Sequence, residues 1–348
     1  MKTIQPINVG ATITSTISLN EDLTSAEMGK LWATYMGNSM TKCILSYFLN
    51  HVDDQEIKNV VENALTMCEE FVQTIKEIFT KANFPVPIGF TEADVNLGAP
   101  RLFHDEFYLH YLIYAGKVGI SLYGIALPLM SRLDIRAFYT HVLDSTTKLQ
   151  NQVIDQLTAK GLMDKPPYIP APNKVDFVKK QNYLNGFFGK VRPLHALEIT
   201  HLYDNILNNE TSKTILIGFC QVAKLQQVRE YFVKGKEIAY KHIETFSQFL
   251  HEEDLPSPPL LDHMVTDSTF PPFSDKLMLF HKLDMFTMRI RSYGNSMAVN
   301  GRHDLEAKYA QLLLDVANYA EDGANIMIDL EWMEQPPGAI DRDSLTLN

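Results

Sequence analysis

The sequence predicts an all-α protein made of two tandem four-helix bundles that arose by internal duplication. Residues 23–87 align with residues 194–258 at a constant shift of 171, and beyond the first loop the shift becomes 170. Identical residues at equivalent positions include Leu31 and Leu202, Asn38 and Asn209, Lys42 and Lys213, Pro85 and Pro256, and Tyr139 and Tyr309. Each copy shows apolar residues at helical spacing, and no segment is typical of a strand.

Four helices are expected in each copy. In the first they run at about 24–51, 54–82, 104–130 and 133–160, and in the second at about 195–222, 225–252, 274–300 and 303–332. The first helix opens with a capping-box pattern from Thr24 to Glu27. Pro85 and Pro87 end the second, because proline cannot continue a helix, and Ser274 is a suitable N-cap for the seventh.

The connections between these helices predict the topology. Short links join the first helix to the second and the third to the fourth, whereas a crossover of twenty residues (FPVPIGFTEADVNLGAPRLF) joins the second to the third. A four-helix bundle with one long crossover has the connectivity of ferritin-like folds. The predicted fold class is therefore two tandem ferritin-like four-helix bundles.

Three segments divide the chain. Residues 1–163 form the first bundle with an N-terminal extension, residues 164–193 form a joint, and residues 194–348 form the second bundle with a C-terminal tail. The joint is rich in aromatic and aliphatic side chains, unlike a flexible Gly/Ser tether. It is expected to be ordered and packed on a bundle, with a short helix near 173–185. The tail GAIDRDSLTLN is expected to fray.

Composition excludes some classes of function. A net charge of −11 argues against binding nucleic acid through phosphate neutralisation. The three cysteines, Cys43, Cys68 and Cys220, form no close pair, as expected for reduced thiols in a cytoplasmic protein. The N-terminus lacks a continuous apolar core, so no signal peptide is expected. No uninterrupted apolar run reaches the length of a membrane span.

Several segments resemble a known family. NLGAPRLF, PPYIPAPNKVDFVKKQ, PFSDKLMLFH and YAEDGANIMI, in the duplicated layout, are similar to the domain of unknown function 3231. This family occurs in spore-forming Gram-positive bacteria, is placed in the ferritin-like superfamily and is commonly doubled in one chain. The resemblance implies the two-bundle fold but no catalytic residue. Related families include a spore coat protein, which implies a spore-associated structural alternative by analogy.

The sequence lacks the full ligand set of a di-iron enzyme. Such enzymes place a Glu on each of two helices and a Glu-x-x-His on each of the other two. Here the one Glu-x-x-His runs from Glu198 to His201, and its first-repeat counterpart, from Glu27 to Lys30, has no histidine. Both glutamates are adequately explained as capping residues. No catalytic residue is assigned, and an enzyme is not expected.

A second set of residues is a candidate metal site in the second bundle. Where the first repeat has aromatic and amide side chains, the second has His242, His281, Asp284, Glu321 and Asp322. Imidazoles with carboxylates suit one Fe, Mn or Zn ion. If the sixth and seventh helices are parallel, His242 lies about 15 Å from His281, so His281 and Asp284 with an acid of the last helix form the better-placed group. The alternative is core histidines bonded to polar neighbours.

A polar pair recurs on the inward stripe of both first helices. Asn38 and Lys42 in the first repeat correspond to Asn209 and Lys213 in the second. Buried amides and ammonium groups are costly unless paired, so we expect a hydrogen-bonded polar layer, with Glu237 as a partner of Lys213. The alternative is that both lysines extend their charges to the surface between helices.

These observations favour a non-enzymatic function. The leading interpretation is a cytoplasmic bundle protein that acts by binding or structural association, through a protein partner or a second copy, in stress or sporulation. The first alternative is a degenerate metal-binding protein with one site in the second bundle. The second is a carrier of a small apolar ligand, because the second repeat is rich in methionine, which packs adaptably around ligands.

Overall fold

The computed structural model describes residues 22–299, 301–342 and 345, and confirms the all-α fold with its duplication. The first bundle consists of α2 (Ser25–His51), α3 (Gln55–Lys81), α4 (Asp105–Ala126) and α5 (Leu133–Ala159). The second consists of α6 (Ala196–Val222), α7 (Gln226–His251), α8 (Asp275–Val299) and α9 (His303–Asp329). The N-terminal extension and the last part of the tail lie outside the described residues.

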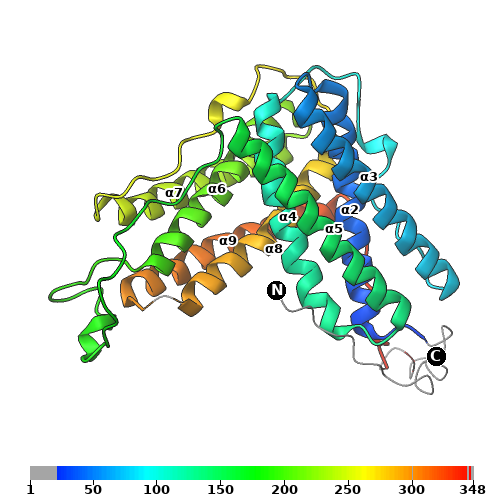
Figure 1. The fold of residues 1–348 in the computed structure, drawn as a ribbon. Helices are drawn as coiled ribbons and strands as arrows, with labels where there is room; N and C mark the ends of the chain where they lie inside the picture. The colour runs from blue at the N-terminus through cyan, green and yellow to red at the C-terminus, as the bar shows by residue number, and fades with distance from the viewer. Residues whose placement is uncertain (1–21, 300, 343–344, 346–348) are drawn as a thin grey trace.

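Helix bounds follow the predicted ones to within a few residues, and equivalent helices of the two repeats begin at the same register. Single 3-10 turns lie at Glu92–Asp94, Leu127–Leu129, Gln181–Leu184 and Asp262–Met264. Figure 1 shows the two bundles diverging from a shared upper end, so that the molecule has the outline of an inverted V. Each bundle has one long crossover; the ferritin-like designation itself stays a prediction.

One buried glutamate in each repeat links the start of the first helix to the turn that precedes the fourth helix. Thr24 and Glu27 form the predicted capping box, and Glu27 also accepts hydrogen bonds from the backbone before α5, at Ser131 and Arg132. Glu198 caps α6 with His195 and accepts from the backbone of Gly301 before α9. The predicted capping role of both glutamates is thus confirmed.

The two crossover loops pair with each other through an approximate twofold axis. Val95 bridges Phe273, and Phe103 bridges Val265, in antiparallel fashion. These bridges are equivalent, because residue 95 corresponds to 265 and residue 103 to 273. Such reciprocal contacts are those of an isologous dimer interface. The duplicated chain therefore packs its two repeats as a symmetric dimer would.

The helix α8 is buried on two sides. The ring of Phe286 packs 5.0 Å from that of Tyr319 in the second bundle, while His281 and Met285 face the first bundle. The helix therefore supplies side chains to both repeats.

One described segment, Asp105–Leu129, is long and apolar enough to cross a membrane by length and composition alone. It comprises α4 and the turn that follows, and its residues Phe107, Tyr108 and Leu109 are fully buried in the first bundle. Core helices of bundles meet the same criterion, so this is weak evidence for a span.

The prediction that the joint packs on a bundle is wrong for most of its length. Every residue from 168 to 182 is exposed, and the expected helix is reduced to the turn Gln181–Leu184. Each bundle already closes its core with four helices, and the prolines of PPYIPAP prevent the joint from forming another. The end near Tyr183 is fixed, because its ring lies 4.2 Å below the guanidinium of Arg192.

Candidate ligand-binding cavity

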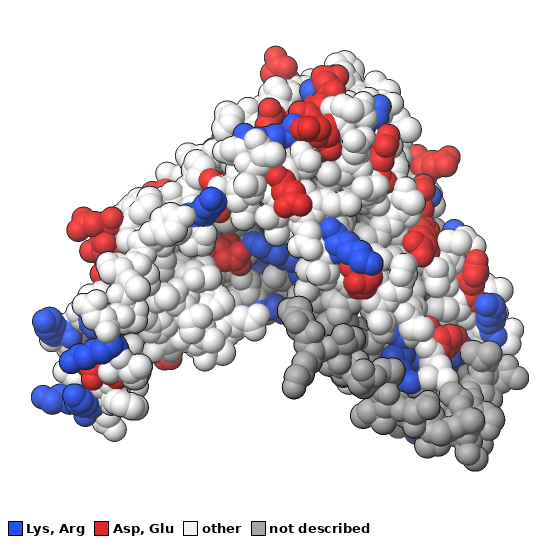
Figure 2. Space-filling model, in the orientation of Figure 1, with Lys and Arg blue, Asp and Glu red and all other residues white. Residues whose placement is uncertain are grey.

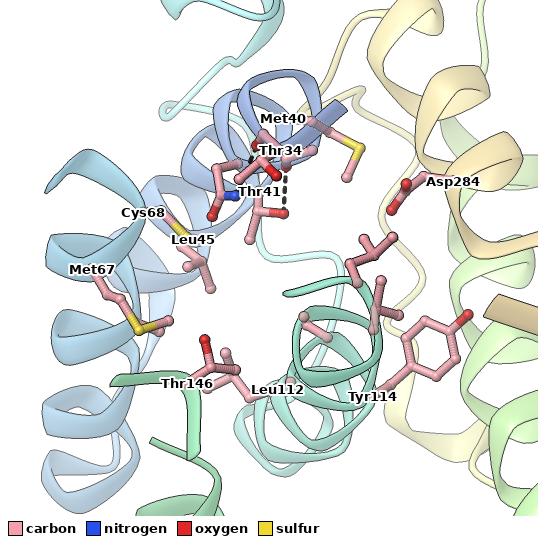
Figure 3. A pocket seen from close by; sticks show the side chains of 18 of the residues that line it. Thr34, Met40, Thr41, Leu45, Met67, Cys68, Leu112, Tyr114, Thr146 and Asp284 are labelled. Atoms are coloured by element: carbon pink, nitrogen blue, oxygen red, sulfur yellow. Dashed lines mark hydrogen bonds between the residues drawn. The ribbon is translucent and has the colours of Figure 1, made fainter. Parts of the chain in front are cut away.

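A cavity of about 90 Å³ lies inside the first bundle, among α2, α3, α4 and α5, with α8 at one end. Figure 3 shows the side chains of Leu45, Met67, Leu112 and Thr146 directed into it from different helices. Most of the wall is apolar or small, from Met40, Leu45, Ala64, Met67, Cys68, Leu112, Ala115, Gly116, Val118, Gly119, Leu122 and Leu149. The exposed Ala33 and the half-buried Gly37 lie on the α2 side of this wall.

Comparison of the repeats explains why the first bundle is hollow. Wall residues Gly119 and Leu149 correspond to Arg289 and Tyr319 in the second repeat. Small side chains in one copy thus stand where large ones stand in the other. The same helical architecture therefore occurs twice in one chain, with a cavity in the first bundle and large side chains at the equivalent place in the second.

The second bundle fills this volume through a reciprocal tyrosine pair. The rings of Tyr231 and Tyr319 stack at 4.1 Å, and each hydroxyl donates to the other residue's carbonyl, at 3.1 and 2.6 Å. The Tyr319 hydroxyl lies where a side chain at Gly235 would begin, and Tyr231 does the same at Gly323. Gly235 corresponds to Ala64 of the cavity wall, so the pair occupies the equivalent space.

Most polar groups of the cavity wall already have partners. Asn38 donates to the Thr34 carbonyl at 2.8 Å and to the Tyr123 hydroxyl at 3.1 Å, while the Thr34 and Tyr139 hydroxyls lie 3.1 Å apart. Thr146 donates to a carbonyl of its own helix. These groups stabilise the wall without needing a ligand, so the body of any ligand here meets mainly apolar surface.

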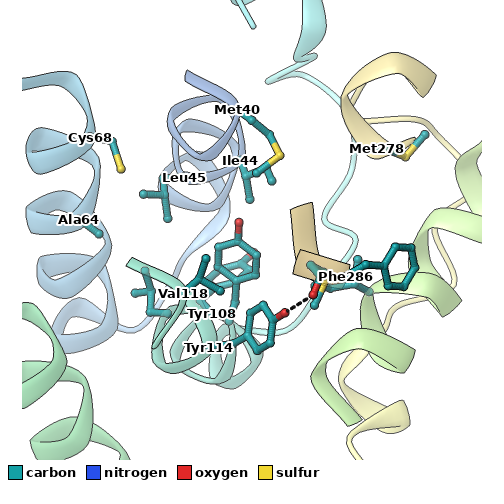
Figure 4. Close-up of a cluster of buried hydrophobic side chains, with 14 of the residues drawn as sticks. Met40, Ile44, Leu45, Ala64, Cys68, Tyr108, Tyr114, Val118, Met278 and Phe286 are labelled. Atoms are coloured by element: carbon teal, nitrogen blue, oxygen red, sulfur yellow. Dashed lines mark hydrogen bonds between the residues drawn. The ribbon is translucent and has the colours of Figure 1, made fainter. Parts of the chain in front are cut away.

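The α8 end of the cavity differs, because it contains polar atoms that lack hydrogen-bond partners. Tyr111 and His281 Nε2 are hydrogen-bonded at 3.2 Å, but His281 Nδ1 is buried with no partner among the described residues. Figure 3 shows the Asp284 carboxylate directed toward the cavity. Tyr114 instead donates to the Met285 carbonyl at 3.0 Å, as Figure 4 shows.

Electrostatics sets this end apart from the rest of the wall. Burial raises the pKa of Asp284 to about 6, which the positive charge of Arg291 partly opposes. Burial lowers the pKa of His281 to about 3, helped by the charge of Lys282, so this imidazole is neutral near pH 7. A carboxylate beside a neutral imidazole favours a hydrogen-bond donor, above all a cationic one.

Tyr111 and His281 are equivalent residues of the two repeats, and their rings stack 5.7 Å apart. A contact between equivalent positions lies on the approximate twofold axis. The polar end of the cavity is therefore built at the junction of the repeats and needs both of them.

The five residues predicted to bind a metal do not converge. His281 and Asp284 lie together on α8, whereas Glu321 and Asp322 are exposed on α9, and Asp322 pairs with Lys234 at 2.6 Å. His242 is buried elsewhere in the second bundle and is bonded to the Tyr293 hydroxyl at 2.8 Å. Among the described residues, no three His, Cys, Asp or Glu side chains gather around one point. Metal binding stays a prediction.

The recurring asparagines make the same contacts in both repeats. Asn209 donates to the Asn205 carbonyl at 2.7 Å and the Tyr293 hydroxyl at 2.9 Å, matching the two bonds of Asn38. A buried amide on each first helix is thus held by a tyrosine of the third.

The recurring lysines differ. Lys213 is buried and lies 3.3 Å from Glu210 and 3.0 Å from Asp262, whereas Lys42 is half-buried. The expected partner Glu237 is exposed instead, so that assignment is wrong. Its position on α7 turns it toward solvent, while Glu210 lies one turn from Lys213 on the same helix.

Two buried cations of the second bundle were missed by the sequence analysis. Lys282 and Arg289 both donate to the Ser212 hydroxyl, at 2.6 and 2.7 Å. Burial, with the nearby charge of Arg289, lowers the pKa of Lys282 well below its ordinary value. They correspond to Leu112 and Gly119 of the cavity wall. An alignment of the two repeats could have found them as charged replacements on an inward stripe.

The fold and the cavity together define the class of protein: a duplicated helical-bundle protein with a cavity in one of its two bundles. The chain belongs to the family described as Protein of unknown function (DUF3231), whose model matches residues 11–175 and again residues 182–345. A crystal structure of a candidate spore coat protein from Bacillus halodurans C-125 is similar at 16% identity with a TM-score of 0.39, over 43% of this chain and 98% of that one. No curated protein matches the chain.

Proposed function

We propose that the protein is a non-enzymatic carrier of a small amine with an apolar body, bound in the cavity of the first bundle. The observation that supports this most directly is the hollow at the place where the second repeat is filled by the stacked pair Tyr231 and Tyr319. Natural cores are close-packed, so a hollow retained beside a filled copy favours a bound molecule.

The size of the cavity limits the body of the ligand. An engineered apolar cavity of about 150 Å³ holds one benzene molecule. In proportion, about 90 Å³ suits a body of about four carbon atoms. The wall contributes methionine, leucine and alanine side chains there, so a branched alkyl group fits it best.

The polar end of the cavity selects the head group. Asp284 has no hydrogen-bond donor bound to its carboxylate among the described residues, and a protonated amine would supply one with an opposite charge. A neutral hydroxyl would make a weaker bond to the same oxygen. A purely apolar molecule would leave Asp284 and His281 Nδ1 as they are.

The chemistry of the wall favours binding over catalysis. Cys68 is a potential nucleophile in it, but burial raises the pKa of this thiol to about 12, so the thiol stays protonated near pH 7. The Tyr111 hydroxyl is likewise held protonated by burial, which raises its pKa.

The test uses isobutylamine, isobutanol and isopentane, which share a branched body and differ in the head group. Binding to the full-length protein is measured by equilibrium dialysis at neutral pH, and the rise in melting temperature supplies a second readout. We expect affinity to fall in the order amine, alcohol, alkane. Asp284→Asn should lower the affinity for isobutylamine about tenfold and leave that for isopentane unchanged.

Asp315→Asn, which removes a carboxylate near His242 in the second bundle, is the matched control and should bind isobutylamine like the unmodified protein. Equal affinity for all three molecules would overturn the assignment of the head group. Absence of binding of all three would overturn the carrier function itself.

A further inference from the structure

The joint between the bundles is chemically unlike the rest of the surface. Between residues 164 and 193 there are six Lys or Arg and two Asp, a net charge of +4 in a chain whose total is −11. Figure 2 shows basic side chains gathered at the lower left end of the molecule, where Figure 1 places the joint. A basic segment on an acidic protein favours a negatively charged partner.

Aromatic side chains alternate with these charges and are open to solvent. Tyr168 is 90% exposed, Phe177 78% and Phe188 85%. Val175 and Val178 beside them are also exposed. Isolated apolar residues on a surface are ordinary, but a run of them on one projecting segment marks an interaction site.

Backbone structure decides which partner fits. The prolines at 166, 167, 170 and 172 exclude a helix there and provide no backbone donors for pairing as a strand. Residues 173–180 form neither a helix nor a strand. The segment thus offers separate aromatic and lysine tips on an extended chain. Such tips suit the interfacial layer of a membrane, where aromatic rings enter the headgroup region and lysines meet anionic lipids.

We propose that the joint docks the protein on an anionic lipid surface. Lys165, Lys174, Lys180 and Lys190 are exposed and supply the attraction. The joint projects from the body, and at physiological salt the Debye length is about 8 Å, so acidic residues farther away are largely screened. The end at Tyr183 and Arg192 fixes the segment to the second bundle through the ion pair of Arg192 with Glu198, at 2.7 Å.

The test is co-sedimentation of the full-length protein with vesicles at about 50 mM and about 500 mM KCl. One set contains equal parts phosphatidylglycerol and phosphatidylcholine, and the other contains phosphatidylcholine alone. We expect binding to the anionic set at low salt, lost at high salt. Lys174→Glu/Lys180→Glu and Phe177→Ser/Phe188→Ser should each weaken partitioning about tenfold or more.

Lys76→Glu/Lys148→Glu on the first bundle changes the net charge equally and should bind like the unmodified protein. All substituted residues are exposed, so circular dichroism should show an unchanged fold. Equal binding to both vesicle sets, or no loss in the joint variants, would overturn the proposal. A dimeric mass by light scattering that the Phe177→Ser/Phe188→Ser variant abolishes, without vesicle binding, would assign the joint to a second copy instead.

Discussion

Filling the cavity of the first bundle with the second repeat's own side chains should stabilise the protein and abolish binding. The double variant Ala64→Gly/Leu149→Tyr reproduces Gly235 and Tyr319 at equivalent positions. The new hydroxyl can then donate to the carbonyl of Val60, as Tyr319 does to that of Tyr231 at 2.6 Å. The glycine is needed because the Tyr319 hydroxyl stands where a methyl group at residue 235 would lie.

The expected magnitude follows from the volume. Cavities cost about 24 cal/mol per Å³, so filling about 90 Å³ contributes about 2 kcal/mol. Replacing alanine by glycine inside a helix costs about 1 kcal/mol. The free energy of unfolding of the first bundle should therefore rise by about 1 kcal/mol.

Urea unfolding followed by Trp32 fluorescence measures this change. Trp32 lies on α2 and the other tryptophan, Trp332, follows α9, so a Trp332→Phe background reports on the first bundle. The single variant Leu149→Tyr, which keeps the Ala64 methyl group in the way, should be destabilised. A double variant that still binds isobutylamine, or that is less stable than the unmodified protein, would refute the reasoning.

Three further predictions concern the second bundle. Gly235→Ala should lower the free energy of unfolding by about 1–3 kcal/mol because the new methyl group meets the Tyr319 hydroxyl, whereas Gly294→Ala, with open space around it, should be neutral or slightly stabilising in the same urea titration. Burial lowers the pKa of His242 to about 3, whereas a histidine in the unfolded chain titrates near pH 6.5. Its contribution to stability is therefore present above pH 6.5 and is lost as the pH falls toward 3. The variant His242→Phe should reduce the loss of stability between pH 7 and pH 5 by up to about 2 kcal/mol. Lys282→Leu introduces the first repeat's residue and removes a buried amine that has no carboxylate partner among the described residues. It should raise the melting temperature, by the equivalent of about 1–3 kcal/mol; a lower melting temperature would mean that Lys282 stabilises the core.

The architecture could be predicted from sequence because it rests on local and repeated signals. Helical periodicity, the Thr24 capping box and the prolines after α3 place the helix ends, and the constant shift between the copies predicts two equivalent bundles. The joint was the exception. Its aromatic residues indicated packing, but whether a core has room for them depends on the three-dimensional closure of each bundle, which periodicity does not show.

The cavity could not be predicted in the same way. Gly119 and Leu149 are typical of inward-facing helix positions. Only the larger residues at the equivalent positions, Arg289 and Tyr319, indicate that the two cores are filled to different extents. The metal hypothesis rests on the same comparison, which identifies residue types but not the direction in which each side chain of α9 points. Glu321 and Asp322 face solvent on α9, while His281 faces the first bundle. The twofold packing of the repeats brings α8 to the cavity, and this long-range contact leaves no local pattern in the sequence.

The measurement that tests the central claim most directly is a methyl NMR titration of the full-length protein with isobutylamine. If the first bundle holds the ligand, methyl signals of Leu45, Met67 and Leu149 should shift saturably, while those of the second-repeat equivalents Leu216 and Ile238 stay in place. Shifts distributed over both repeats, or none at saturating isobutylamine, would contradict the account.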